Sequence, residues 1–300
     1  MKKILSIGEL LIDFIPKQKG CSLDEVTDFE RVAGGAPANV VTAAARLGLD
    51  AAMISQVGMD AFGTHILNVL KQNGVDTSYI FRTSKANTGL AFVSLDKTGN
   101  LFLSEEQITE DKFKNAYALH FCSVDLVEMP VKYAHKKAIE LAKKSGAFIS
   151  FDPNVRLPLW NSPEECQEAI REFLPYADII KLSDDEIEFV TDCKDEKEAA
   201  QKLIDMGCKL VLITRGSEGS AIYTQNSFAE TESLKVNVVD TTGAGDSFIG
   251  SLLYQLTRDN ITDLSALTAE NLENYLKFSA KYASLTVSKK GAVMATLEDM

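Results

Sequence analysis

The residues with the clearest chemical potential stand together at positions 240–248, which read Asp-Thr-Thr-Gly-Ala-Gly-Asp-Ser-Phe. The alternating apolar run 234–239 before them predicts a strand, and residues 249–256 after them predict a helix. Gly243 and Gly245 therefore fall between a strand and a helix, where glycines let an anion approach the backbone N–H groups. The positive end of the helix dipole lies at the same point, so the turn is suited to binding a phosphate group.

Asp246 stands in the first turn of that predicted helix, next to the expected phosphate. A carboxylate beside a phosphate is unfavourable for binding alone, but it could accept the proton of a hydroxyl that attacks the phosphate. The helix start is expected to keep Asp246 ionised and therefore a weak base. The alternative is that Asp246 only caps the helix and that the glycines only form a tight turn.

A second glycine-rich stretch, residues 33–39, reads Ala-Gly-Gly-Ala-Pro-Ala-Asn. Gly34 and Gly35 would let a ligand approach the backbone closely, and Asn39 offers one acceptor and two donors to hydroxyl groups. The alternative is a tight strand-to-helix joint. Asp13 is an acid inside an apolar run, which suits either a contact with sugar hydroxyls or an outward-facing strand position.

Two more candidate groups follow predicted strands. Arg156 could form charge-assisted bonds to a transferring phosphate, or it could be a surface arginine in a proline-rich loop. Glu186, in the sequence Ser-Asp-Asp-Glu, could organise Mg²⁺ through water, although an acidic helix start needs no ligand to explain it.

The order of predicted elements indicates an α/β fold with a parallel sheet covered by helices on both faces. Strands are predicted at 4–15 (broken at Gly8), 51–57, 118–123, 147–151, 177–182, 209–214 and 220–224, and helices at 40–47, 60–73 and 130–145. Ligands bind such sheets beyond the carboxyl ends of the strands, where the stretches beginning at residues 152, 183, 214 and 240 lie.

Composition argues against a nucleic-acid or membrane partner. The 300 residues carry a net charge of −12, and 45% of them are hydrophobic, which supports a sizeable core. The five dispersed cysteines are typical of reduced thiols in a cytoplasmic protein. No apolar stretch is long enough to span a bilayer, and acids interrupt the first apolar run too soon for a signal peptide.

Residues 240–248 and 33–39 resemble the C-terminal and N-terminal signatures of the ribokinase-like PfkB family of sugar kinases, and the resemblance extends from Gly8 to Gly291. It implies one ribokinase-like domain over 1–300, a parallel-sheet sandwich covered by helices, with a small β lid at about 13–33 and 87–103. Relatives normally carry a longer stretch after Asn100, so no sugar contact is assigned there. A homodimer formed through the lid is a further expectation.

The resemblance also implies roles for individual residues. The catalytic set would be an anion hole of Gly243, Ala244 and Gly245, the base Asp246, and Arg156; the sugar contacts would be Asp13, Gly34, Gly35 and Asn39. The nucleotide would be bound by Ser183, Thr214, Arg215, Gly216, Ser217 and Gly219. Glu186 would serve Mg²⁺, and Asp240, Thr242, Thr286, Lys289 and Gly291 would surround K⁺.

The expected reaction is transfer of the γ-phosphoryl group of ATP to a primary hydroxyl of a sugar, with D-fructose giving fructose 6-phosphate. 2-Keto-3-deoxygluconate or another sugar is the alternative substrate, and a non-catalytic sugar sensor is the alternative function. The absence of a Gly-x-x-x-x-Gly-Lys-Ser/Thr motif excludes a P-loop kinase. A dinucleotide dehydrogenase would need a third glycine in a turn near an early strand.

Overall fold

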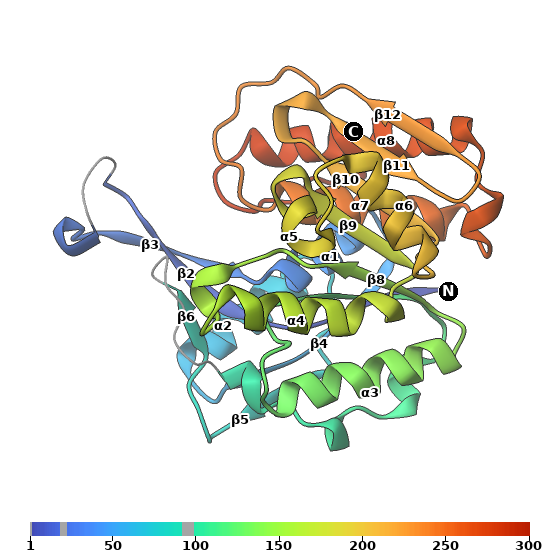
Figure 1. Cartoon of the computed structure of the whole chain (residues 1–300). Coiled ribbons are helices and arrows are strands. Elements are labelled where there is room, and N and C mark those ends of the chain that lie inside the picture. Colours follow the sequence, from blue (N-terminus) through green and yellow to red (C-terminus); the bar gives the residue numbers. More distant parts are fainter. Residues whose placement is uncertain (1, 19–22, 92–98) are drawn as a thin grey trace.

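The computed structural model describes residues 2–18, 23–91 and 99–300. Its main feature is a nine-stranded sheet with the order β12-β11-β10-β9-β8-β7-β1-β4-β5 (Figure 1). The strands are β1 (Lys3–Ile7), β4 (Asp50–Gly58), β5 (Ile80–Thr83), β7 (Ala116–Cys122), β8 (Phe148–Asp152), β9 (Ile179–Ser183), β10 (Leu210–Thr214), β11 (Ser220–Tyr223) and β12 (Phe228–Thr231). The run from β10 to β5 is parallel, whereas β11 and β12 pair antiparallel, so the expected parallel sheet ends in an antiparallel edge.

Helices cover both faces of this sheet, as the alternation of elements predicted. They are α1 (Ala36–Arg46), α2 (Ala61–Gln72), α3 (Pro130–Lys144), α4 (Pro163–Phe173), α5 (Ile187–Thr191), α6 (Glu196–Asp205), α7 (Ala244–Arg258) and α8 (Ala269–Val287). Successive residues of β10 show the two faces: Leu212 packs in the cluster with α1, α2, α7 and α8, and Ile213 packs in the cluster with α3 to α6. Both faces of the strands are therefore apolar.

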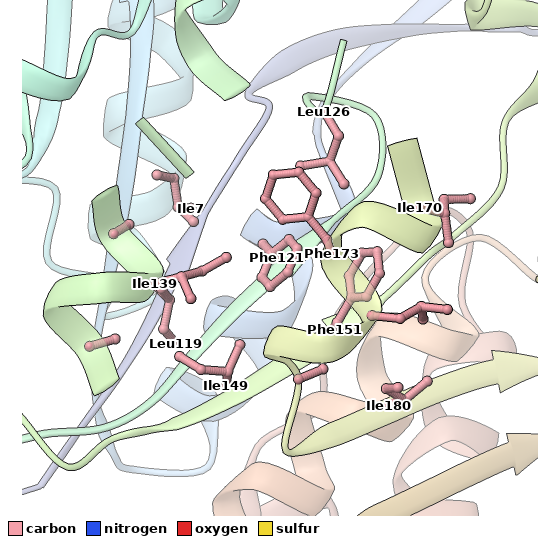
Figure 2. Close-up of a cluster of buried hydrophobic side chains, with 14 of the residues drawn as sticks. Ile7, Leu119, Phe121, Leu126, Ile139, Ile149, Phe151, Ile170, Phe173 and Ile180 are labelled. Atoms are coloured by element: carbon pink, nitrogen blue, oxygen red, sulfur yellow. The ribbon is translucent and has the colours of Figure 1, made fainter. Parts of the chain in front are cut away.

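The second of these clusters is dominated by aromatic and branched side chains (Figure 2). Phe121 of β7 stacks on Phe151 of β8 with ring centroids 4.5 Å apart, and Phe173 of α4 meets Phe121 edge-on. These rings lie between the sheet and the helices that cover it (Figure 2). They fix the spacing of β7, β8 and α4, and the polar ends of the same strands carry the candidate site.

A separate three-stranded sheet joins β3 (Phe29–Gly34), β2 (Leu11–Pro16) and β6 (Gly89–Ala91) in that order. In Figure 1 β2 and β3 extend outward from the main body. The predicted strand 4–15 is thus two strands in two different sheets, separated at Gly8, whose φ is +150°. From the second predicted lid segment the structure describes β6 in this sheet, residues 92–98 lie outside the described part, and Leu103 is buried in the main core.

The strand predicted at 234–239 is wrong. This segment has no strand partner and runs over the surface, where Leu234, Val238 and their apolar neighbours are about half exposed. Val239 N–H and Asp240 N–H both donate to the carbonyl of Val287 at the end of α8. All six side chains of 234–239 are exposed, so the alternation does not separate a buried face from an exposed one.

Among the described residues, none of the helices combines the length and the apolar character needed to cross a bilayer.

Candidate active site

The first turn of α7 is formed by the glycine-rich stretch. Gly243 is the residue before the helix and has φ +77°, a left-handed conformation that favours glycine; a Cβ there would also lie 2.7 Å from Cβ of Ala292. No side chain caps this helix start. Ala244 N–H donates to the carbonyl of Thr241 at 3.2 Å, and the following N–H groups open the helix, where backbone donors lack partners within the helix.

Asp246 is buried in that first turn and meets the second glycine-rich stretch. Its Oδ2 accepts a hydrogen bond from Nδ2 of Asn39 at 2.8 Å, so the two predicted motifs touch although they are far apart in sequence. Burial raises the pKa of Asp246 to about 6, helped by the charge of Asp152 and opposed by the Asn39 bond and by Lys181 and Arg156. At pH 7 Asp246 is therefore still mostly ionised, as expected, but it is a stronger base than the helix dipole alone predicted.

The start of α1 carries the other predicted sugar contacts. Gly35 precedes the helix with φ +123°, and a Cβ there would lie 2.3 Å from the carbonyl oxygen of Glu9. A Cβ on Gly34 would lie 2.1 Å from Oδ2 of Asp13, so the carboxylate and the glycine backbone are in contact. Asn39 N–H donates to the carbonyl of Gly35 at 3.0 Å. Asp13, Gly34, Gly35 and Asn39 thus form one connected group that reaches Asp246.

Asp13 is partly buried, and this burial raises its pKa to about 6. A carboxylate removed from water gains from hydroxyl hydrogens that replace its solvent. Glu9, which the sequence did not single out, accepts a hydrogen bond from Ala36 N–H at 2.9 Å and so fixes the start of α1. Its only signal in the sequence is an acid between two apolar runs.

Asp152, the last residue of β8, forms a buried ion pair with Lys181 in the middle of β9. Nζ of Lys181 lies 2.8 Å from Oδ2 of Asp152, and a Cβ on Gly245 would lie 2.9 Å from the same Nζ. Sequence reasoning missed Lys181. The available signal was a lysine inside an otherwise apolar strand. A buried lysine is favourable only when it is paired with an opposite charge.

Arg156 and Glu186 occupy the loops that follow β8 and β9. Arg156 is exposed, its Nη1 donates to the carbonyl of Val155, and its charge lowers the pKa of Asp246. The buried carboxylate of Glu186 accepts hydrogen bonds from Val155 N–H at 2.6 Å and Ser183 N–H at 2.8 Å. Glu186 therefore ties the two loops together, which accounts for its position without a metal.

Four of the predicted nucleotide residues, Arg215, Gly216, Ser217 and Gly219, lie in the turn between β10 and β11. Thr214 is the last residue of β10 and lies opposite Ser183, the last residue of the neighbouring strand β9. Arg215 N–H closes the turn on the carbonyl of Gly219 at 2.8 Å, and Ser217 accepts a hydrogen bond from Ser233. Gly219 has φ +106° and would clash with Thr231 if it carried a Cβ. Thr214 Oγ1 donates to the carbonyl of Leu182, and Gly216 has a positive φ.

The side chain of Arg215 is held by protein carboxylates. Its guanidinium pairs with both oxygens of Glu196 at 2.6 and 2.7 Å and with Glu230 at 3.3 Å. These contacts raise the pKa of Arg215 and anchor the turn on α6 and β12. Arg215 therefore positions the backbone of this turn, and its guanidinium is less available for a phosphate than the sequence suggested.

The predicted cation residues lie on two segments joined by Asp240. Its Oδ1 accepts from the N–H and the hydroxyl of Thr242, and its Oδ2 accepts from Gly291 N–H at 2.9 Å. Thr286 is in the last turn of α8, and its carbonyl accepts from Lys289 N–H at 3.1 Å. Within the described residues, no group of three or more His, Cys, Asp or Glu side chains could hold a metal ion, so a cation here would depend largely on carbonyl and hydroxyl oxygens.

Comparison with known proteins places the chain in a family. The family model described as pfkB family carbohydrate kinase matches residues 1–299. The chain is 40% identical to "Probable fructokinase-2" of Arabidopsis thaliana, over 99% of this chain and 93% of that protein. It is 40% identical to "Fructokinase-2" of Solanum lycopersicum, over 97% of this chain and 92% of that protein.

Solved structures agree with this result. Fructokinase with bound ATP from Xylella fastidiosa superposes with a TM-score of 0.87 at 29% identity, covering 99% of this chain and 96% of that one. A fructokinase double mutant from Vibrio cholerae O395, bound to fructose, ADP and potassium ion, gives 0.86 at 29% identity, covering 97% and 94%. An E. coli protein described as ribokinase II, in complex with ATP and Mg²⁺, gives 0.85 at 27% identity, covering 97% and 94%.

Proposed function

The chain belongs to the pfkB family of carbohydrate kinases, and on that premise we propose that it transfers the γ-phosphoryl group of ATP to the 6-hydroxyl of D-fructose. The observation that carries the proposal is the buried Asp246, which is bonded to Asn39 of the glycine-rich stretch. This contact joins a base at a phosphate-binding helix start to a group of residues suited to sugar hydroxyls. The names of the relatives support fructose as the sugar.

Asp246 would accept the proton of the attacking hydroxyl. A base works best when its pKa lies near the pH of the reaction, and burial brings the pKa of Asp246 to about 6. In a loose transition state the proton leaves late, when the hydroxyl has become acidic, so a base of this strength is sufficient. Asn39 would keep the carboxylate oriented because it occupies Oδ2 and leaves Oδ1 for the substrate.

The start of α7 would stabilise the charge on the transferring phosphoryl group. Gly243 and Gly245 carry no side chain that would keep an anion from the backbone, and the helix dipole favours negative charge there. Arg156 is exposed in the loop after β8, and its charge lowers the pKa of Asp246. We assign it to the transferring group rather than to the sugar.

Asp13, Gly34, Gly35 and Asn39 would bind the sugar. A neutral polyol can donate hydroxyl hydrogens to Asp13, whereas the carboxylate of 2-keto-3-deoxygluconate would be repelled by it and would need a cationic partner. We therefore expect the protein to prefer fructose over the acid by at least about tenfold in kcat/KM, or roughly 1.4 kcal/mol.

ATP would approach from the side of the β10–β11 turn and residues 234–242. Thr214, Gly216, Ser217, Gly219 and Ser183 provide mainly backbone and hydroxyl groups there, and Arg215 holds the turn in place. Mg²⁺ keeps several waters and binds phosphate oxygens, so Glu186, whose oxygens each accept one N–H, could act on it through water. When bound, Mg²⁺ would neutralise charge on the phosphates.

A K⁺ ion would fit beside Asp240 and Thr242, because Asp240 already gathers Thr242 and Gly291 around one carboxylate. Its bond to Gly291 connects this region to the segment with Thr286 and Lys289. The ion would fix the loop before the anion hole without contacting the sugar. Replacing K⁺ by tetramethylammonium should then lower kcat or the affinity for ATP, while the KM for fructose stays the same. Equal rates in the two salts would contradict a cation site.

The three-stranded sheet would act as a lid, since β2 carries Asp13 and β3 ends at Gly34. Its outward extension in Figure 1 also offers a surface through which two copies could pair. We further propose a cytoplasmic location without nucleic-acid or membrane partners, in line with the net charge of −12 and with the free thiols of the four described cysteines.

The decisive experiment measures ADP release with a panel of sugars and then lets fructose and 2-keto-3-deoxygluconate compete in one assay. Fructose 6-phosphate as the main product would support the proposal. Preferential phosphorylation of the acid would overturn the sugar assignment, and no sugar-dependent ADP release would overturn the kinase assignment itself.

A further inference from the structure

Lys181 is a buried cation that the proposed reaction does not yet use. It lies in β9, is 6% exposed, and its Nζ is paired with Asp152. The side chain of Lys181 packs against the first turn of α7: a Cβ on Gly245 would lie 2.9 Å from Nζ and 3.2 Å from Cε of Lys181. An ammonium group is thus packed against the backbone of the predicted anion hole.

The two glycines of this turn are required for different reasons. Gly243 has a left-handed φ of +77°, so its backbone conformation favours glycine. Gly245 lies inside the first helical turn without a positive φ, a conformation that any residue can adopt. The space that a side chain at position 245 would need is occupied by the end of the Lys181 side chain. A contact below 3 Å requires something to shift, and Lys181 is held by its ion pair with Asp152.

The charge of Lys181 is maintained by its surroundings. Burial lowers the pKa of Lys181, but the carboxylates of Asp152, Glu186 and Asp246 raise it by more than burial lowers it. The pKa of Lys181 therefore lies above its ordinary value. A buried ion pair adds little to stability by itself, because desolvation offsets most of the attraction. The position of the pair directly under a phosphate-binding turn therefore suggests a role in that turn.

We propose that Lys181 is a positioning residue for phosphoryl transfer: it supports the Gly245 backbone from below and places a fixed positive charge under the anion hole, and position 245 is glycine because Lys181 fills its side-chain space. The inference rests on the proposed kinase function and deepens it. A charge that is already in place when negative charge develops requires no reorganisation during the reaction.

The first test asks whether residues 181 and 245 share one space. Gly245→Ala should lower kcat by roughly tenfold to 100-fold, the size of a damaged oxyanion site. The same substitution is then made in a protein that already carries Lys181→Ala and Asp152→Asn, in which the space beside position 245 is open and no charge is left unpaired. There Gly245→Ala should lower kcat by less than about threefold further, because the effects of neighbouring sites are not additive. The same coupling should appear in the free energy of unfolding. Equal losses in both backgrounds would overturn the shared space.

The second test isolates the charge. The double variant Lys181→Met with Asp152→Asn keeps the volume of the pair and removes both charges. We expect kcat to fall by about tenfold or more while the KM for fructose changes less than about threefold, which a loss of folding would not produce. Lys209→Met is the matched control, because Lys209 pairs with Asp178 at 2.9 Å near the opposite end of β9 and β10 and should leave kcat unchanged.

A folded double variant with a kcat within about threefold of the wild type would overturn the charge role. If the unmodified protein phosphorylates no sugar, the proposed function fails and the role in transfer fails with it. The coupling in unfolding free energy, measured without substrate, would then still show whether Lys181 determines the residue at position 245, so the two failures can be told apart.

Discussion

Helices start in two different ways in this molecule, and the difference separates the candidate site from the rest of the fold. Before α1 and α7 stands a glycine with positive φ, Gly35 or Gly243, which has no side chain with which to cap the helix. By contrast, α2, α4, α6 and α8 are capped by the side chains of Asp60, Ser162, Asp195 and Thr268, each of which accepts a backbone N–H.

A side-chain cap satisfies early N–H groups of a helix, whereas a glycine supplies no such acceptor. The first N–H of α1 is accepted by Glu9 instead, and that of α7 by the carbonyl of Thr241. The two glycine starts also meet, because Asn39 of α1 bonds to Asp246 of α7. The comparison teaches that the two helix starts assigned to the candidate site lack the capping residue that stabilises four of the other helices. Helices α3 and α5 lack a side-chain cap as well, but they begin after Met129 and Glu186 rather than after a glycine.

The largest expected effect comes from the base at the α7 start. Asp246→Asn should lower kcat by roughly 100-fold or more, since it removes the proton acceptor but keeps the Asn39 contact. ATP binding, measured by calorimetry, should be nearly unchanged. Asp195→Asn at the capped start of α6 is the control and should leave kcat as it is. A near-normal kcat in Asp246→Asn would remove Asp246 from the mechanism.

The pH profile should report the same group with a smaller effect. The pKa of Asp246 is about 6, so kcat/KM should fall as the pH drops through 6 and lose roughly tenfold by pH 5. Asp13 has a pKa raised to the same region and should contribute to the same limb. A profile that stays flat down to pH 5 would contradict a base with this pKa.

The substitution Asp246→Asn should increase the stability of the fold although it lowers activity. Because the pKa of Asp246 is raised above its unfolded value, the folded protein binds this proton more tightly, and the group weakens folding as pH rises through the range between the two pKa values. Asp246→Asn should therefore raise the free energy of unfolding at pH 7, by about 1 kcal/mol. Urea unfolding measures it, and a clear loss of stability would show that burial of the charge is not costly here.

The smallest effect is expected at a capped helix. Thr268→Ala removes the side-chain acceptor for Asn271 N–H at the start of α8 and should cost about 1 kcal/mol of unfolding free energy. The kinetic constants should stay within error of the wild type, as measured with fructose and ATP. A change in kcat would mean that the capped starts are not separate from the site.

The fold and the glycine-rich starts could be predicted because their signals are local. The alternation of strands and helices indicates the sheet, and the spacing of Gly243, Gly245 and Asp246 indicates where α7 starts. The helix that follows this turn begins as predicted, although the segment before it is not a strand.

The parts that could not be predicted depend on distant partners. Lys181 is favourable inside a strand only because Asp152 ends the neighbouring strand, and that adjacency is set by the strand order. The apolar run 234–239 alternates like a strand, but it pairs with none of the described strands. The break at Gly8 marks where β1 and β2 separate, but it does not indicate which sheet each strand joins.

The bond between Asn39 and Asp246 also has a consequence for biosynthesis. The two residues are 207 positions apart. During translation Asn39 is therefore synthesised well before Asp246. At typical elongation rates of 5–20 residues per second this interval lasts about 10 to 40 s. Until α7 has left the ribosome, the glycine-rich start of α1 lacks the residue proposed as the base. On that proposal, the nascent chain gains catalytic competence only after α7 has emerged and packed against α1.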